Sequence, residues 1–344
     1  TNMGGMFYQA NAFNQNLSIW NVSSLSDANA MFSGVTLSTP NYDSLLIGWA
    51  SRTPVLKNNT IFSGGNSKYT IAALSARNTT LIGFHNWTIT DGGMDTSGTF
   101  VSSWNTSANS SAGSSNQSMI MLPLEAGGTY NFLVDWGDTK SDIITSWNDV
   151  HPNHTYTTPG VYTINITGTI VGFRVNNVGD KLKINNILQW GNLNVGNNAT
   201  YFYGCSNLNF TGSDNLNLTG TTNLNSMFFG ASIFNGNISG WDTSNATDIA
   251  LMFATAFNRD ISRWNTSSVT TMSTMFWSAT NFNQNISNWD TSKVTSMTSM
   301  FSIASAFNQD ISNWNTSNVQ SMNYMFNTAG NFNKNLSGWD TRKV

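Results

Sequence analysis

MFSIASAFNQDISNWNTSNVQS, residues 300–321, is the stretch that decides the fold of this chain. The pattern recurs in MFATAFNRDISRWNTSSVTT (252–271), MFWSATNFNQNISNWDTSKVTS (275–296) and MFNTAGNFNKNLSGWDTRKV (325–344). Its tryptophans are separated by 23, 25, 25 and 25 residues, at Trp241, Trp264, Trp289, Trp314 and Trp339. A period of this length is typical of proteins built from stacked repeats, in which each repeat contacts only its neighbours.

Two spacings of apolar residues lie within each repeat. Val269, Met272, Met275 and Phe276 follow a helical spacing, whereas residues 307–314 alternate like an extended segment. These spacings predict one helical turn and one short strand in each coil of a solenoid, with coils stacked at about 4.8 Å. We expect the tryptophans to pack in its core. A stripe that stacks on carbohydrate is the alternative.

The expected fold is therefore mainly β, with a solenoid of 25-residue coils, a helical cap and a small antiparallel β-sandwich. Residues 41–52 and 64–84 have helical spacing, and residues 87–93 alternate like a strand, so together they predict the cap. The expected segments are final coils at 1–32, a cap at 33–93, a Ser/Gly/Asn linker at 94–118, a sandwich at 119–170, a bridge at 171–200 and coils at 201–344.

The repeat pattern also continues from the last residues to the first. Three markers keep a spacing of 25 residues when a second copy is placed after the first: Trp339 and Trp20, Met325 and Met6, and Phe332 and Phe13. A coil that is cut in the middle exposes apolar side chains and unpaired backbone. We therefore expect copies of the chain to join end to end, the Val344 side to the Thr1 side, in a covalent tandem array or a head-to-tail filament.

Two stretches resemble known families. VDWGD (134–138) with HTYTTPGVYTINITG (154–168) resembles a polycystic-kidney-disease (PKD) type immunoglobulin-like domain, although Thr139 stands where a second glycine is common. The 25-residue repeat, with ILQWG (187–191) and YGCSNL (203–208), resembles BspA-like bacterial surface proteins. This resemblance implies a leucine-rich-repeat-like solenoid, a PKD/Ig-like sandwich, a secreted or cell-surface location, and adhesive or structural roles.

Composition argues against several classes of protein. Charged residues make up 9% of the chain and its net charge is −3, without the basic run that nucleic acid requires. A hydrophobic content of 39% is too high for a disordered chain. No window of about 18 apolar residues exists, so we expect no membrane span.

Chemistry-bearing residues are scarce. Glu125 is the single glutamate, which excludes a paired-glutamate glycosidase but leaves aspartate pairs open. The sequence lacks the HExxH motif of zinc proteases, the GxSxG motif of serine hydrolases and a glycine-rich phosphate-binding loop. We expect no enzyme activity, no catalytic residues and no cofactor.

A few acidic and histidine side chains remain candidates for a metal. Asp135 and Asp138 are weak calcium candidates, and the alternative is that they bond backbone amides in a hairpin. His154 is expected to make a structural hydrogen bond, and His151 with His154 and Asp149 is a second metal hypothesis. The single cysteine, Cys205, is predicted to be a buried thiol.

Aspartate and asparagine interchange at equivalent repeat positions, as in Asp290 and Asn315. A catalytic or metal role would require a fixed charge, so this interchange favours side-chain-to-backbone hydrogen bonds in tight turns. Nineteen N-x-S/T sequons make glycosylation candidates of Asn16, Asn21, Asn58, Asn78, Asn86, Asn105, Asn109, Asn116, Asn153, Asn165, Asn198, Asn209, Asn217, Asn237, Asn245, Asn265, Asn285, Asn315 and Asn335.

Two functions fit these observations. The first is a structural subunit of an extracellular fibre or cell-surface array. The second is a surface adhesin that binds host or matrix glycan or protein. Trp277, Tyr324 and Tyr8 lie outside the core pattern, and a clustered exposed stripe of such aromatics would favour binding.

Overall fold

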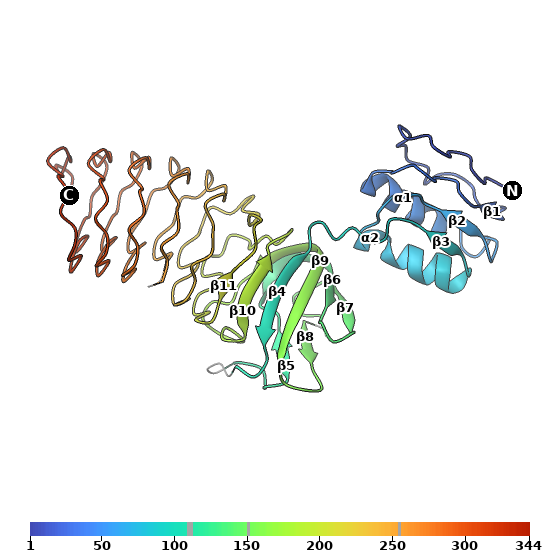
Figure 1. Cartoon of the computed structure of the whole chain (residues 1–344), viewed down its shortest axis with the longest axis horizontal. Helices are drawn as coiled ribbons and strands as arrows, with labels where there is room; N and C mark the ends of the chain where they lie inside the picture. Colours follow the sequence, from blue (N-terminus) through green and yellow to red (C-terminus); the bar gives the residue numbers. More distant parts are fainter. Residues whose placement is uncertain (109–112, 150–151, 254–255) are drawn as a thin grey trace. The chain divides into compact units, whose positions relative to one another are not determined.

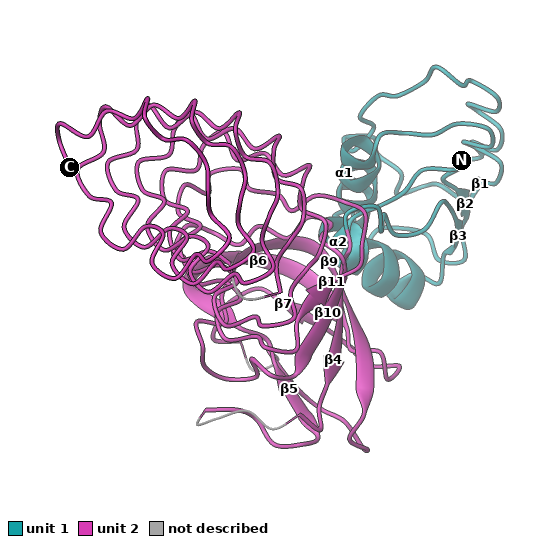
Figure 2. Ribbon diagram, turned by 60° about the vertical axis from the view of Figure 1, so that its left-hand side comes forward, with its two compact units in different colours: residues 1–98 teal, residues 99–344 magenta. Residues whose placement is uncertain are grey.

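The computed structural model describes residues 1–108, 113–149, 152–253 and 256–344. It contains two compact units, residues 1–98 and residues 99–344 (Figure 2). Each unit has its own cluster of buried apolar side chains, so each is described by itself.

Unit 1 is a small parallel sheet covered by helices. The sheet has the order β1 (Asp27–Ala28), β2 (Ile61–Ser63), β3 (Thr88–Thr90). The helices are α1 (Thr39–Ala50), α2 (Ile71–Leu74) and the π-helix η1 (Ser75–Phe84). They lie in the two segments whose apolar spacing predicts helices. Trp49 of α1 packs on Phe62 of β2 at 5.1 Å between ring centroids, which fixes the helix on the sheet.

Unit 2 begins with a six-stranded sheet in the order β11-β10-β4-β9-β6-β7 (Figure 1). Its strands are β4 (Phe100–Asn105), β6 (Leu124–Asp135), β7 (Ser141–Ile144), β9 (Val161–Phe173), β10 (Ile184–Gln189) and β11 (Asn209–Phe210). The pairs are antiparallel except for β10 with β11. A separate pair joins β5 (Met119–Met121) and β8 (Asn153–Thr155).

The expected β-sandwich over residues 119–170 is wrong. Strands β6, β7 and β9 share a single sheet with β4 and β10, which lie in the segments expected to be a linker and a bridge. Phe100, Ser102 and Trp104 of β4 are buried, and this alternation places one face of the strand against the core. Strands from outside the expected domain thus complete the sheet. The result is one mixed sheet, whereas a sandwich consists of two antiparallel sheets packed face to face.

The expected leucine-rich-repeat-like coil, with one helical turn and one strand, is also wrong. The described residues from 211 to 344 form turns and single bridges, with neither the helical turn nor the strand expected of each coil. The repeats nevertheless lie side by side (Figure 1). Parallel bridges join Asn223 to Asp248, Asp248 to Thr271, Thr271 to Ser296 and Ser296 to Ser321.

Tight turns explain why the apolar spacing resembles that of a helix. The amide N–H of Met275 donates to the carbonyl of Met272, and that of Trp289 donates to the carbonyl of Ile286, both at 3.2 Å. A chain of such three-residue turns repeats apolar side chains at i and i+3 as a helix does. Spacing alone therefore cannot distinguish the two structures.

The core of the repeats consists of stacked rings. Trp264, Trp289 and Trp314 lie parallel at centroid distances of 6.5 and 6.3 Å, with 4% exposure or less. Each indole N–H donates to an isoleucine carbonyl of the preceding repeat, as Trp289 does to Ile261 at 3.1 Å. The prediction that the repeat tryptophans pack in the core is confirmed, and so is the buried position of Cys205. Burial raises the pKa of the Cys205 thiol.

None of the helices in the described residues is long and apolar enough to cross a membrane.

We predict that Trp289→Ala lowers the free energy of unfolding of unit 2 by about 3–5 kcal/mol, because it empties the space between two stacked indoles. Trp339→Ala removes the same side chain from a half-buried position with one tryptophan neighbour, so its loss is expected to be smaller. Denaturant unfolding followed by tryptophan fluorescence measures both. Equal losses would contradict the ladder as the source of stability.

Candidate functional site

Successive repeats are joined by backbone hydrogen bonds, most of which form a row that runs in one direction; a bond such as that from Gln320 to Thr295, at 2.8 Å, runs the other way. Amide N–H groups at alternate positions of one repeat donate to carbonyls of the next repeat. The bonds run from Met297 to Ser321, Ser299 to Asn323, Phe301 to Met325 and Ile303 to Asn327, at 2.8 to 2.9 Å. Residues 272–278 bond residues 296–302 in the same way, as do residues 3–9 and 27–33 within unit 1.

Two residues in each of these repeats have a left-handed backbone conformation, and both lie in the segment that donates the bonds. Ser299 and Ile303 have φ values of +54° and +64°, and Thr274 and Ser278 have +56° and +60°. Alternation between left- and right-handed residues turns neighbouring peptide groups to the same side. One face of a repeat therefore presents N–H donors, and the opposite face presents carbonyl acceptors.

The last described repeat leaves its donors uncovered. The amide N–H groups of Met322, Tyr324, Phe326 and Thr328 bond no group within the described residues. Phe332 and Trp339 beside them are half-buried, whereas their equivalents one repeat earlier, Phe307 and Trp314, are buried. We call residues 322–328 with Phe332 and Trp339 the donor face.

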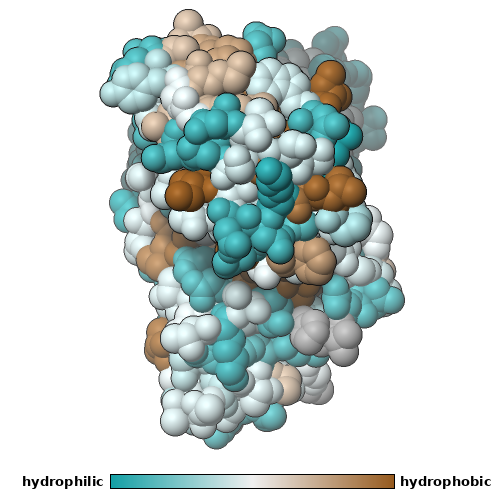
Figure 3. Space-filling view, turned by 90° about the vertical axis from the view of Figure 1, so that its right-hand side faces the viewer, coloured by the Kyte–Doolittle hydropathy of each residue, from teal (hydrophilic) through white to brown (hydrophobic). Residues whose placement is uncertain are grey.

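Unit 1 carries the opposite arrangement. The carbonyls of Asn2, Gly4, Met6 and Tyr8 accept no hydrogen bond from the described residues. Met6 is 55% exposed, whereas Met31 in the following repeat is fully buried. Hydrophobic patches interrupt the polar surface seen from the side on which the N-terminus lies (Figure 3). We call residues 2–8 with Phe13 and Trp20 the acceptor face.

The aspartates and asparagines of the repeats close tight turns. The amide N–H of Ser292 donates to Oδ1 of Asp290 at 2.9 Å, and that of Ser317 donates to Oδ1 of Asn315 at 3.1 Å. The turn interpretation of their interchange is confirmed. Hydrogen bonds from Ser292 and Ser262 hold the pKa of the Asp290 and Asp260 carboxyls below their ordinary value.

The two calcium candidates make bonds inside the hairpin between β6 and β7. Oδ1 of Asp135 accepts from the amide of Gly137 at 2.9 Å, and Oδ1 of Asp138 accepts from that of Lys140 at 3.2 Å. A hydrogen bond from His154 at 2.8 Å contributes to lowering the pKa of Asp138 against the opposing effect of its burial. Thr139 has a φ of +74°, a left-handed conformation that favours the glycine usual there.

His154 and the single glutamate have structural partners. His154 also stacks on Trp136 at 4.9 Å, so its expected structural hydrogen bond is confirmed. Asp149 accepts from Thr145, and His151 lies outside the described residues. Glu125 lies 3.6 Å from Nε of Arg174. Within the described parts of the chain, no three His, Cys, Asp or Glu residues gather into a metal-binding group.

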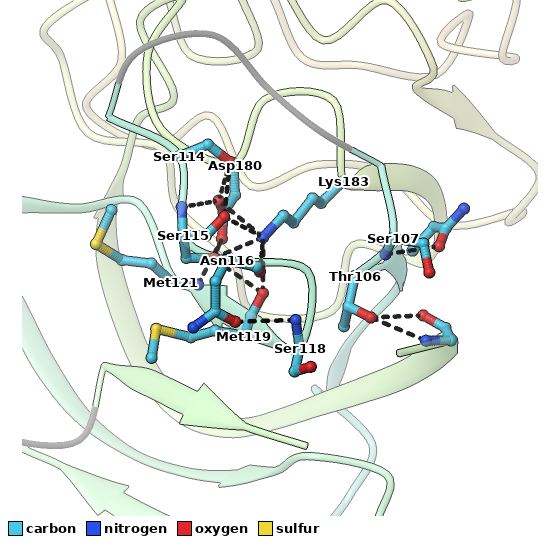
Figure 4. A network of polar contacts seen from close by, with 12 residues as sticks. Thr106, Ser107, Ser114, Ser115, Asn116, Ser118, Met119, Met121, Asp180 and Lys183 are labelled. Atoms are coloured by element: carbon cyan, nitrogen blue, oxygen red, sulfur yellow. Dashed lines mark hydrogen bonds and ion pairs between the residues drawn. The ribbon is translucent and has the colours of Figure 1, made fainter. Parts of the chain in front are cut away.

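A buried ion pair is a feature that sequence reasoning missed. Nζ of Lys183 lies 3.4 Å from Oδ1 of Asp180, with side-chain exposures of 0% and 1% (Figure 4). The ammonium also donates to the carbonyls of Ser115, Asn116 and Met119 at 2.7 to 2.9 Å. Burial lowers the pKa of Lys183. With the ammonium directed at these carbonyls, at Oγ of Ser115 and at Asp180, the pair holds residues 114–121 against β10 and leaves no free base.

Many sequon asparagines take part in the same turns. Oδ1 of Asn237 accepts from the amide of Ser239 at 3.1 Å, and Oδ1 of Asn285 accepts from that of Ser287 at 3.0 Å. In this turn the serine or threonine stands two residues after the asparagine, which is the sequon spacing. Turn chemistry therefore accounts for many of the sequons, and their glycosylation stays a prediction. Asn109 lies outside the described residues.

One of the three aromatics outside the core pattern belongs to a cluster. Trp277 is 37% exposed, and its ring lies 6.0 Å from that of Phe229, which lies 5.3 Å from Tyr203. We call these three rings the aromatic stripe. Tyr324 and Tyr8 are 74% and 60% exposed and contact no other aromatic ring in the described residues. Each ring of the stripe directly follows the buried phenylalanine of its repeat, a signal already visible in the sequence.

Comparison with known proteins places this pattern in a family. A model of the family described as "Mycoplasma protein of unknown function, DUF285" matches residues 1–67, 173–267 and 254–344, together more than half of the chain. The matched segments carry both the donor face and the acceptor face. None of the curated proteins and none of the solved structures matches the chain.

We predict that replacing Asp242, Asp260 and Asp290 by asparagine flattens the pH dependence of stability. Their pKa values are lowered below 3.8 in the fold, so each contributes stability above that value that is lost as pH falls through the folded pKa. Asparagine keeps the bond at every pH. Thermal unfolding at neutral pH and at about pH 2 should therefore differ less in the variant.

The matched control replaces Asn265, Asn285 and Asn315 by aspartate, which should steepen the same dependence. Identical pH profiles for the natural chain and both variants would contradict this role of the turn carboxylates.

Proposed function

This chain belongs to the DUF285 family, and we propose that it is a structural subunit of an extracellular fibre or cell-surface array. In this proposal, copies of the chain join through their repeats, so that the stack of one copy continues into the next. The partner is another copy of the same chain, and the assembly lies outside the cell or on its surface.

The observation that carries the proposal is that one repeat docks on the next through the same kind of backbone bonds and stacked rings. Phe326 and Trp339 keep part of their surface in solvent, although the same positions are buried in every described interior repeat of unit 2. Phe7 and Trp20 are half-buried in the same way in unit 1. A repeat that docks on either face would bury these rings as interior repeats do.

Composition supports association between copies of the chain. With 9% charged residues, the surface is solvated by Asn, Ser and Thr, many of which are already engaged in turns. Such a surface has weak long-range repulsion between copies, which favours close association. The proposal assigns no reaction to the chain.

The test is the mass of the 344-residue chain in solution. We predict that light scattering gives a mass that rises with concentration above 37.6 kDa, because docking buries the exposed rings. Trp339→Asp places a charge in the donor face and should keep the mass near that of one chain. Asn313→Asp adds the same charge at an exposed position of an interior repeat and should associate like the natural chain.

A mass of one chain at the highest soluble concentration would contradict the proposal.

The aromatic stripe favours a second candidate function, a surface adhesin that binds glycan. Tyr203, Phe229 and Trp277 come from different repeats, and their rings follow one another at 5.3 and 6.0 Å. Aromatic faces provide apolar contact at low entropic cost. A sugar chain laid along the stripe would contact successive rings.

We predict that Trp277→Ala weakens binding to an immobilised glycan array by about tenfold or more, as for an aromatic side chain that anchors an interface. Trp147→Ala is the control, because Trp147 is 47% exposed and makes no ring contact with the stripe. Glycan binding that survives Trp277→Ala, or that falls equally with Trp147→Ala, would place the site elsewhere.

A further inference from the structure

We propose that unit 2 binds a carboxylate attached to an apolar body, as in a hydrophobic carboxylic acid or the last residue of a peptide, in a groove built around Arg174. The inference concerns a surface apart from the contacts between repeats, and it goes beyond the proposed function. All residues that line this groove lie between Met121 and Asn198.

Two cavities of unit 2 share a wall. The first has a volume of about 420 Å³ and is lined by residues 121–124, 147–149, 152–153, 174–175 and 178–180. The second has a volume of about 470 Å³ and is lined by residues 124–126, 174, 176, 178 and 198. Both volumes fall in the range of roughly 300–1,000 Å³ that is usual for small-molecule sites. We call the two cavities together the Arg174 groove.

The end of strand β9 places Arg174 in the wall that the cavities share. The amide N–H of Arg174, the first residue after the strand, donates to the carbonyl of Pro123 at 2.8 Å. Two of the residues that follow, Asn177 and Gly179, have φ values of +60° and +57°. This left-handed backbone turns the chain, and Val178 between them lines both cavities.

The guanidinium of Arg174 is held by the protein at one nitrogen. Its Nε donates to the carbonyl of Ala199 at 3.0 Å and to Oγ1 of Thr200 at 2.9 Å. Oε1 of Glu125 lies 3.6 Å from the same nitrogen. The two terminal nitrogens bond no group within the described residues. They form a planar fork that matches the two oxygens of a carboxylate, so the fork is fixed in place and its donors are open to a ligand.

The charges of the groove favour a singly charged anion. Arg174 is the one cation among the described residues that line it. Asp180 is neutralised by Lys183, and its side chain is only 1% exposed (Figure 4). Glu125 and Asp149 leave two further carboxylates in the lining, and these repel a doubly charged phosphate more strongly than a carboxylate. The groove therefore fits a carboxylate better than a phosphate.

The first cavity supplies an apolar surface beside the fork. Its lining includes Leu122, Pro123, Trp147 and Val178. Trp147 and Val178 are 47% and 57% exposed, so this surface is open to a ligand. An apolar group that covers these side chains removes apolar area from water, and a rigid ring provides such contact at low entropic cost. We expect the apolar body of the ligand here, with its carboxylate at Arg174.

The experiment measures the binding of four small probes to the 344-residue chain by isothermal titration calorimetry. N-acetyl-leucine and octanoate each carry a carboxylate on an apolar body, and their amides lack the charge. We expect each acid to bind at least about tenfold more tightly than its amide, because only the acid makes charge-assisted bonds to the fork. Tighter binding of N-acetyl-leucine than of octanoate would identify a peptide terminus as the ligand, and the reverse order a free acid.

Two variants with a matched control locate the site. Val178→Asp places a carboxylate in the shared wall and should weaken the binding of both acids by at least about tenfold. Val161→Asp is the control, because Val161 is 62% exposed and lines neither cavity. Arg174→Lys keeps the charge but removes the fork, so it should weaken the binding of the acids more than that of the amides. Circular dichroism checks that each variant is folded.

Three results would overturn the inference. Equal affinities for acids and amides would show that no carboxylate is recognised. Val178→Asp that binds the acids as the natural chain does would place the binding elsewhere. A chain that binds none of the probes at millimolar concentration would have no such site. The proposed function is tested separately by the mass of the chain, so either statement can fail while the other stands.

Discussion

Everything in the repeats depends on the one-directional row of amide-to-carbonyl bonds between neighbouring repeats. Residues 211–344 form neither helix nor strand where they are described, so their backbone groups need partners elsewhere. The bonds from one repeat to the next supply three or four of these partners per junction among the described residues, and turns within the repeat supply others. The row also sets the spacing at which Trp289 and Trp314 stack, so backbone bonding and the apolar core support each other.

The sheet of unit 2 provides one end of this arrangement. Val171 of β9 forms a parallel bridge with Asn194, which bridges Asn217, so pairing of the repeat kind starts directly at the sheet. The buried Lys183 holds residues 114–121 beside β10, which pairs with β4 and β11. The first repeats are therefore covered by ordered structure, whereas the donor face has no such cover within the described residues.

The unusual composition follows from the same geometry. A turn that closes on a side-chain oxygen needs Asn, Asp, Ser or Thr, and a left-handed residue is needed twice in each repeat. Asp290 and Asn315 make the same bond to a following serine, which explains why charge is interchangeable at this position. A low content of charged residues is thus a consequence of a turn-based fold, and it also leaves few groups capable of acid–base chemistry.

Sequence by itself determined the 25-residue period, the burial of Trp289 and Cys205, the turn role of Asp290 and Asn315, and the hydrogen bond of His154, because each follows from local pattern or residue chemistry. The apolar spacing of the repeats wrongly predicted a helical turn in each coil, because tight turns and a helix share the i, i+3 period. Only the tertiary structure placed β4 between β9 and β10, brought Lys183 to Ser115, and assembled Tyr203, Phe229 and Trp277 into one stripe. It also decided that the donors of each repeat face one way, because peptide orientation depends on backbone angles and on partners distant in sequence.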